Sequence, residues 1–284
     1  MKIPEIAILL ATYNGELYLA QQLDSIINQT NKDWLLYVRD DGSIDSTVEI
    51  LKKYEQKNSN IIILNDSIKN RGAMNSFIWL MENVNSEYYM FCDQDDVWLP
   101  NKIEVSYLEL LKIQSGNTLI PLLVFTDLFI VDESLNVISS SMWEYTHLKR
   151  VMDLKFLLIG SFATGCTMLF NNRAKLCALK YKNHALMHDS LLALSTLVNR
   201  GEIKGVSDSL IYYRQHGNNT LGTSKFNNSI ISRFTNIRKV LRINYRYFRF
   251  VHAITNISIF KFLLLKMEAG YKIRNVKCVD NFLE

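Results

Sequence analysis

The sequence 88-YYMFCDQDDVW-98 joins five hydrophobic residues directly to an acidic cluster. A short uninterrupted hydrophobic run is typical of a strand buried on both faces of a sheet. Asp93, Asp95 and Asp96 follow it, and carboxylates this close repel one another unless a cation lies among them. Hard oxygen ligands favour Mg²⁺ or Mn²⁺. The alternative is a cluster that caps the helix expected near Pro100, although one acidic residue would suffice for that.

Comparable runs lie on either side of this stretch. Residues 6–11, 34–38 and 61–64 have the pattern of buried strands, and segments with helical periodicity separate them. Residues 122–126, 164–170 and 210–214 read as further strands. Repeated strand–helix units predict an α/β fold, with a mostly parallel, Rossmann-like sheet flanked by helices on both faces.

Polar residues follow each of the first four predicted strands. The segments are 11-ATYNG-15, 40-DDGS-43, 69-KNRG-72 and 93-DQDD-96. Ligands of open parallel sheets bind beyond the carboxyl ends of the strands, so we expect these segments to form one site. The sequence contains neither the G-x-G-x-x-G fingerprint nor a phosphate-binding P-loop, which disfavours a dinucleotide oxidoreductase and a P-loop kinase.

The composition predicts a folded protein whose charge is unevenly distributed. Hydrophobic residues make up 48% and charged residues 21% of the 284 residues, as in chains with a substantial core. Residues 225–284 hold 12 Lys and Arg but only 3 Asp and Glu, while the rest of the chain is mildly acidic. A basic tail suggests contact with an anionic partner such as a membrane surface. A solvated basic helix face is the alternative.

The cysteines and the N-terminus point to the cytoplasm. Cys92, Cys166, Cys177 and Cys278 lie far apart in hydrophobic contexts, as expected of reduced core residues. Residues 1–11 contain Glu5 and no cleavage site, so we interpret them as a first strand and not a signal peptide. No stretch reaches the ~18 uninterrupted hydrophobic residues of a spanning helix. We therefore expect a cytoplasmic protein that is not integral to a membrane.

Residues 217–224 are rich in Gly, Asn, Thr and Ser and predict a linker. We place a first domain at residues 1–222 and a basic helical extension at 223–284. One predicted helix face holds apolar residues, and an adjoining stripe holds arginines: Ile230, Phe234, Ile237, Leu241, Tyr245 and Phe248, beside Arg238, Arg242, Arg246 and Arg249. This pattern favours a helix lying peripherally on the inner face of a membrane. The alternative is a helix packed on the first domain, with its arginines paired to acidic groups there.

The strand-end motifs resemble those of family 2 glycosyltransferases with the GT-A fold. The similar segments are 11-ATYNG-15, 40-DDGSID-45 and 93-DQDDVW-98, the last containing the DXD motif. The resemblance is greatest to bacterial rhamnosyltransferase-type enzymes of surface polysaccharide synthesis. It continues through 165-GCTMLF-170, His188-Asp189 and 212-YYRQHGNN-219, and covers residues 5–222. The extension from residue 225 matches no motif.

The resemblance implies roles for the residues that bind the nucleotide. Ala11 and Tyr13 would line the pocket for the base. Asp41 would accept a hydrogen bond from the base imide, and Asn70 would contact the nucleoside. Asp93 would reach the ribose.

The resemblance also implies roles around the reacting bond. Asp95 would coordinate the metal, with His216 completing the metal or diphosphate site. Arg214 would pair with the departing diphosphate or with an internal acid. Asp189 matches the family's catalytic base. The residue before that base is usually acidic, whereas here it is His188, which would orient Asp189 or touch the acceptor.

The implied reaction is inverting transfer of a sugar from a nucleotide-diphospho-sugar, most readily L-rhamnose from dTDP-L-rhamnose. The acceptor would be a growing polysaccharide or a lipid-linked oligosaccharide, and no nucleic-acid partner is expected. A UDP-hexose or UDP-HexNAc transferase of the same fold is the first alternative, and a sugar-phosphate nucleotidyltransferase the second. A binding module without catalysis and an assembly subunit acting through the basic tail are further alternatives.

Overall fold

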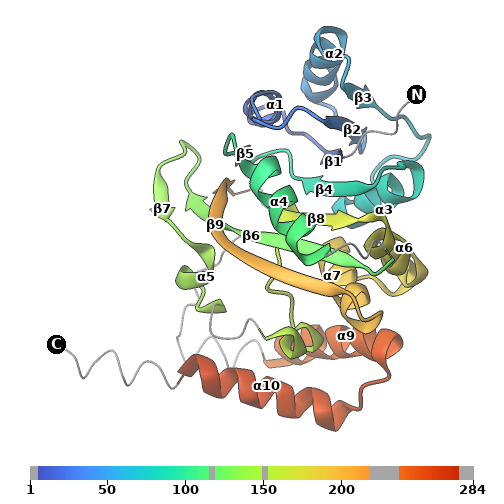
Figure 1. Cartoon of the computed structure of the whole chain (residues 1–284), viewed down its shortest axis with the longest axis vertical. Helices are drawn as coiled ribbons and strands as arrows, with labels where there is room; N and C mark the ends of the chain where they lie inside the picture. The colour runs from blue at the N-terminus through green and yellow to red at the C-terminus, as the bar shows by residue number, and fades with distance from the viewer. Residues whose placement is uncertain (1–5, 115–118, 149–152, 218–236, 275–284) are drawn as a thin grey trace, which may run out of the picture.

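The computed structural model describes residues 6–114, 119–148, 153–217 and 237–274. Within these residues the strands form one mixed sheet with helices on both faces (Figure 1). The strand order is β3-β2-β1-β4-β8-β6-β9-β5, and β7 pairs with β6. The strands are β1 (Ile6–Thr12), β2 (Trp34–Asp40), β3 (Ile61–Ile63), β4 (Tyr88–Cys92), β5 (Val97–Trp98), β6 (Leu122–Val131), β7 (Val137–Ser139), β8 (Met168–Asn171) and β9 (Glu202–Arg214).

The helices connect these strands and cover both faces of the sheet. They are α1 (Leu19–Ile27), α2 (Thr47–Lys57), α3 (Ala73–Asn83), α4 (Lys102–Gln114), α5 (Met142–Tyr145), α6 (Asn172–Lys180), α7 (His188–Val198), α9 (Ile237–Thr255) and α10 (Ile259–Arg274). Two 3₁₀ turns that matter for the site are η2 (Leu154–Leu158) and η3 (Gly165–Thr167).

The first half of the chain has the predicted parallel order. Strand β1 pairs in parallel with β2 and β4, and β2 pairs in parallel with β3. Residues 6–10 of β1 are fully buried because their side chains alternate between two cores. Ala7 and Leu9 face one core, while Ile6, Ile8 and Leu10 face the other. Burial on both faces explains why the strand has no polar alternation.

The second half of the sheet is mixed. Strand β8 lies antiparallel to both β4 and β6, and β9 then runs parallel to β6. The strand predicted at 164–170 begins only at Met168, because Gly165–Thr167 forms η3. The hydroxyl of Thr167 donates to the carbonyl of Thr164 at 2.6 Å and closes this turn. The strands predicted at 122–126 and 210–214 extend to Val131 and back to Glu202.

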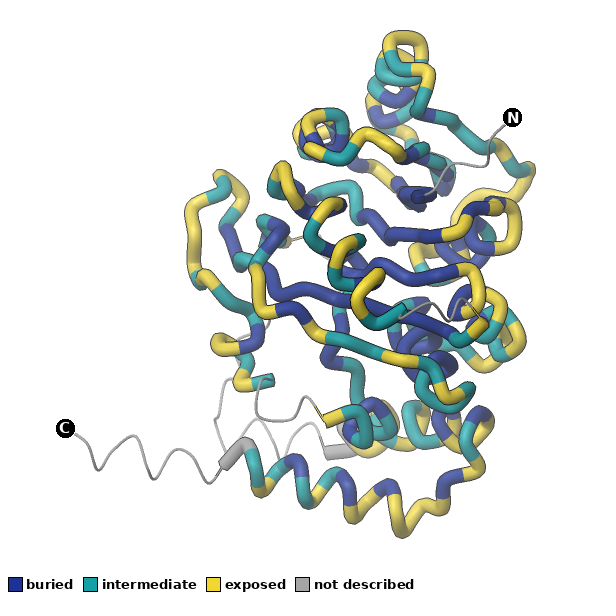
Figure 2. Tube along the Cα trace, in the orientation of Figure 1, coloured by how far each residue is buried: buried dark blue, intermediate teal, exposed yellow. Residues whose placement is uncertain are grey.

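Two hydrophobic clusters fill the space between the sheet and its helices. One lies under α1, α2 and α4, and the other lies under α3, α6, α7, α9 and α10. The central strands are accordingly buried along much of their length (Figure 2). Cys92 and Cys166 are buried free thiols, as predicted. Cys278 lies outside the described residues.

The two C-terminal helices pack on the same core as the sheet. Phe250, Val251 and Ile254 of α9 belong to the cluster that also contains α7 residues. The predicted boundary at 222–223, and with it Ile230 and Phe234, lies outside the described residues. In the described part of the chain no single helix is long and apolar enough to cross a membrane. By length and composition α9 and α10 qualify only as a pair, bent by 119° at the break between them.

Candidate active site

The loop after β1 is held in place by the side chain of Gln94. Its Oε1 accepts a hydrogen bond from the Tyr13 amide at 2.8 Å, and its Nε2 donates to the Tyr13 carbonyl at 3.0 Å. A Cβ on Gly15 would lie 2.5 Å from Gln94 Oε1, so any larger residue here would displace the Gln94 amide. Gln94 thus joins the loops after β1 and β4. Nothing in the sequence indicated this role for Gln94, which lies among the aspartates of the acidic cluster.

The loop after β3 is anchored on Asp41. Its two carboxylate oxygens accept hydrogen bonds from the amides of Arg71 and Gly72 at 2.8 and 2.7 Å. The buried guanidinium of Arg39 donates to Asp41 at 2.7 Å. Asn70 has a φ of 57° and its amide donates to the Asp41 carbonyl. We did not predict a role for Arg39 from the sequence, although a charged residue inside the hydrophobic strand β2 is unusual enough to indicate one.

Asp95 and His216 meet although they are far apart in the sequence. The Nε2 atom of His216 lies 2.9 Å from Oδ2 of Asp95. Arg214 holds the backbone of Asp95 in place. Its Nε donates to the Asp95 carbonyl at 2.8 Å, and its Nη2 donates to the side chain of Gln21 at 2.6 Å. Its guanidinium also lies over the Tyr18 ring. Arg214 is 2% exposed, so these contacts fix the position of the segment that carries Asp95.

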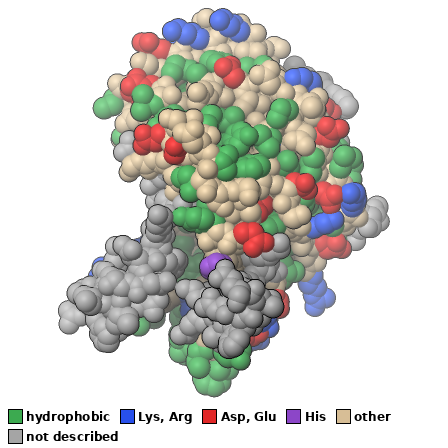
Figure 3. Space-filling model, turned by 90° about the vertical axis from the view of Figure 1, so that its left-hand side faces the viewer, with side chains coloured by type: hydrophobic (Ala, Val, Ile, Leu, Met, Phe, Trp, Pro, Cys, Tyr) green, Lys and Arg blue, Asp and Glu red, His purple; other side chains and the backbone are tan. Residues whose placement is uncertain are grey.

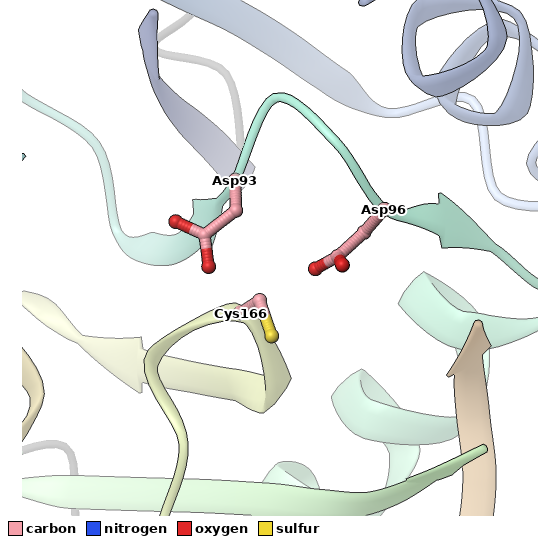
Figure 4. A group of neighbouring side chains, drawn as sticks. All are labelled: Asp93, Asp96 and Cys166. Atoms are coloured by element: carbon pink, nitrogen blue, oxygen red, sulfur yellow. The ribbon is translucent and has the colours of Figure 1, made fainter. Parts of the chain in front are cut away.

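A second acidic group lies beneath this pair. Asp93 follows β4, Asp96 precedes β5, and Cys166 belongs to η3; their ligand atoms lie within 4.8 Å of one another (Figure 4). Burial raises the pKa of Asp93 to about 7, and the carboxylates of Asp95 and Asp189 add to the shift. Burial, with the nearby carboxylates, also raises the pKa of Asp96 well above its usual range. The carboxylates are therefore crowded enough for a cation among them to relieve their repulsion.

The donor atoms at this end of the site suit a hard divalent ion. Neighbouring ligands of an octahedral ion with ~2.1 Å bonds lie about 3.0 Å apart, close to the spacing of Asp95 Oδ2 and His216 Nε2. Burial raises the pKa of the Cys166 thiol well above its usual range, so the thiol stays protonated. Asp95 and His216, and the neighbouring carboxylates of Asp93 and Asp96, are thus the residues that could hold Mg²⁺ or Mn²⁺.

Asp189 enters the site from another helix. It lies in the first turn of α7, beside η3. The preceding His188 is buried, with its ring centre 4.1 Å from that of Phe77 and 4.7 Å from that of Phe91. Burial lowers the pKa of His188 to about 4, so the imidazole is neutral at pH 7. His188 fixes the start of α7 by packing, and Asp189 follows it into the cavity.

One cavity of about 1070 Å³ joins these parts. That volume is large enough for a nucleotide-sized ligand and a second substrate. The structure brings every predicted site residue to its wall except Arg214: Ala11, Tyr13, Asp41, Asn70, Asp93, Asp95, Asp189 and His216. His188 and Gly165 line the wall near Asp189, and Tyr213 also lines the cavity.

The sheet and the acidic site at its strand ends define a protein of the GT-A type. Residues 7–173 match the family described as "Glycosyl transferase family 2", which is more than half of the chain. The chain belongs to this family.

Relatives of the chain include several bacterial glycosyltransferases. It is 38% identical over 99 residues to the dTDP-rhamnosyl transferase RfbG of Shigella flexneri, covering 34% of each chain. It is 32% identical over 108 residues to the putative glycosyltransferase EpsE of Bacillus subtilis, covering 37% of this chain and 39% of the relative. It is 31% identical over 94 residues to the poly(ribitol-phosphate) beta-glucosyltransferase of Bacillus spizizenii, covering 32% and 15%. The chain thus spans well under half the length of each of these relatives.

The fold is shared with solved structures of TarS from S. aureus. The crystal structure of TarS superposes with a TM-score of 0.57 at 17% identity, covering 74% of this chain and 37% of that one. The complex of TarS residues 1–349 with UDP-GlcNAc superposes with a TM-score of 0.54 at 18% identity, covering 76% and 60%. At these identities the similarity establishes the fold.

Proposed function

We propose that this chain is an inverting glycosyltransferase that moves a sugar from a nucleoside-diphospho-sugar to an acceptor hydroxyl. The cavity of about 1070 Å³ carries the proposal, because Asp41, Asp95, His216 and Asp189 all line it. Loops anchored by Asp41 and Gln94 would receive the nucleoside. The acidic end would receive the diphosphate, and Asp189 would face the acceptor.

Asp189 is the general base of this proposal. Its carboxylate takes the proton of the acceptor hydroxyl while that oxygen attacks the anomeric carbon. The bond from that carbon to the diphosphate oxygen breaks, and the nucleoside diphosphate leaves with the electron pair. Attack from the face opposite to the leaving group inverts the configuration. Positioning and electrostatics supply the rate enhancement, since the protein forms no covalent bond with the sugar.

Asp95 and His216 would hold the divalent ion, with Asp93 beside them. A bound Mg²⁺ or Mn²⁺ would neutralise charge that builds up on the departing diphosphate. Arg214 keeps the backbone of Asp95 in place through its hydrogen bond to the carbonyl. It acts as a positioning residue in this proposal, and not as a direct partner of the diphosphate.

We infer dTDP-L-rhamnose as the donor and a saccharide or lipid-linked oligosaccharide as the acceptor. The similarity to RfbG supports the rhamnosyl donor. The similarity to a beta-glucosyltransferase keeps a UDP-hexose or UDP-HexNAc donor as the second candidate. A panel of nucleotide sugars with Mg²⁺ or Mn²⁺ tests both. Release of dTDP from dTDP-L-rhamnose alone supports the first candidate, and UDP release supports the second. Pyrophosphate release from a nucleoside triphosphate and a sugar 1-phosphate, supplied in a separate assay, would instead indicate a nucleotidyltransferase.

A further inference from the structure

The outer face of α10 is apolar and exposed. Its inner face packs into the core through Phe262, Leu265 and Ala269, which are at most 9% exposed. The outer side chains are far more accessible: Ile259 48%, Phe260 70%, Leu263 51%, Leu264 48%, Met267 69% and Tyr271 66%. A helix on a protein surface normally turns polar residues to water. This helix is therefore apolar on both sides.

The exposed residues form one continuous strip. At about 100° per residue they fall within an arc of about 140°, on the side opposite to the buried residues. Figure 2 shows α10 at the outer edge of the molecule with exposed positions along it. Hydrophobic side chains gather at the same end in Figure 3. We call this strip the apolar strip of α10.

The neighbouring helix α9 presents basic residues. Its sequence contains five Lys and Arg and no acidic residue, and α10 adds four basic residues against one acidic residue. Arg242, Arg246 and Arg249 are exposed. Within the described residues none of the three forms an ion pair with a carboxylate, so packing on the sheet does not satisfy their charge.

We propose that the apolar strip of α10 and the arginines of α9 form a docking surface for an anionic lipid bilayer. An interfacial helix needs an apolar strip to enter the headgroup boundary and basic groups to meet the lipid charge. A second copy of this chain fits less well, because the same basic residues would face one another. The inner faces of α9 and α10 are packed in the core, so the helices lie on the bilayer and do not cross it.

The docking surface lies one helix layer from the candidate base. Helix α9 packs on α7, whose first turn holds Asp189. The hydroxyl of Tyr247 in α9 donates to the carbonyl of Leu157 in η2 at 3.1 Å, and η2 contacts both α7 and α10. The helices are thus tied to the cavity wall. A protein docked in this way would hold its site close to the lipid headgroups.

The residues differ in part from those that the sequence indicated. Of the apolar residues that the sequence placed on one face of α9, Leu241 and Tyr245 are exposed, whereas Phe248 packs against the core. The side chains of Ile237 and Arg238 lie outside the described part. From the sequence we placed the apolar residues that would meet a membrane on α9, whereas the exposed apolar strip in the structure lies on α10. The hydrophobic residues of α10 lie on two sides of the helix, so the sequence alone did not indicate which of them are exposed.

Co-sedimentation of the full chain with vesicles tests the proposal without using activity. Vesicles of phosphatidylglycerol with phosphatidylcholine should bind the protein, and binding should weaken as salt rises. The variant Phe260→Glu/Leu264→Glu/Met267→Glu should lower the partition coefficient by at least about tenfold, since several large side chains no longer leave water. Arg242→Glu/Arg246→Glu/Arg249→Glu should abolish the preference for the anionic vesicles over phosphatidylcholine vesicles.

The matched control is Leu108→Glu/Leu111→Glu, which places acidic residues on exposed leucines of α4. It should bind vesicles as the wild type does. Circular dichroism and thermal unfolding check that each variant is folded. Three results would overturn the proposal: no binding of the wild type to anionic vesicles, equal loss in the α4 control, or a dimer in solution that the α10 variant dissociates while vesicle binding persists.

Discussion

Replacing Gly15 with alanine tests how the loop after β1 is held. The new Cβ would lie 2.5 Å from Oε1 and 2.7 Å from Cδ of Gln94, so the amide must move. It would then lose its two hydrogen bonds to the Tyr13 backbone. Each is solvent-exposed and contributes about 0.5–1 kcal/mol, so we expect a loss of about 1–2 kcal/mol in the free energy of unfolding. In a chain of this size the melting temperature should fall by about 2–4 °C.

The same change should weaken nucleotide binding, because Tyr13 lines the cavity. If the full 1–2 kcal/mol appears in binding, nucleoside diphosphate affinity falls roughly 5- to 30-fold. The matched control is Gly160→Ala, since a Cβ at that glycine meets nothing within 4 Å. Thermal unfolding and calorimetric titration of both variants give the two magnitudes.

A double-mutant cycle identifies the route of the effect. In a Gln94→Ala background the clash is absent, so Gly15→Ala should then change stability by less than about 0.5 kcal/mol. If alanine at residue 15 costs as much in that background as in the wild type, the backbone of the loop is the cause. The Gln94 account would then be refuted.

Three further results are expected. Asp189→Asn should keep donor affinity while turnover falls at least ~10²-fold, as measured by steady-state kinetics and donor titration; near wild-type turnover would place the base elsewhere. Because burial lowers the pKa of His188 to about 4, the unfolded chain binds a proton between pH 6.5 and 4 that the folded chain does not. The free energy of unfolding should therefore fall from pH 7 to pH 5 by about 2 kcal/mol more in the wild type than in His188→Gln, as measured by urea unfolding. An equal fall in the two proteins would contradict this. Arg214→Lys loses hydrogen bonds behind Asp95 and should weaken Mn²⁺ binding at least about tenfold in titrations, whereas a lower affinity for nucleotide without metal would indicate direct contact with the diphosphate.

Strands β1 and β4 could be read from the sequence because their burial is nearly continuous. Both are hydrophobic almost to their ends, whereas β2 alternates buried and half-buried positions and includes Arg39 and Asp40. The parallel order then placed Tyr13, Asp41, Asn70 and Asp95 at one edge, and the cavity contains all four. The local hydrophobic pattern, with the rule that ligands bind beyond the carboxyl ends of parallel strands, was sufficient to predict this part of the site.

The rest of the site depends on contacts between distant residues. The hydrogen bonds from Gln94 to Tyr13 span 81 residues, and the contact between His216 and Asp95 spans 121. Only the resemblance to a known family linked the second of these pairs. Arg214 shows the limit of that method, because its side chain turns toward the backbone of Asp95 and does not line the cavity. No local pattern specifies the direction of such a side chain.

Calorimetric titration of dTDP and UDP, with and without Mn²⁺, tests the proposed metal-dependent donor site most directly. In the wild type, Mn²⁺ should raise nucleoside diphosphate affinity at least about tenfold, because the ion links the diphosphate to Asp95 and His216. Asp95→Ala should bind with the weak metal-free affinity under both conditions, while the exposed control Asp33→Ala should behave as the wild type does. Equal affinity in the wild type with and without Mn²⁺ would contradict the account.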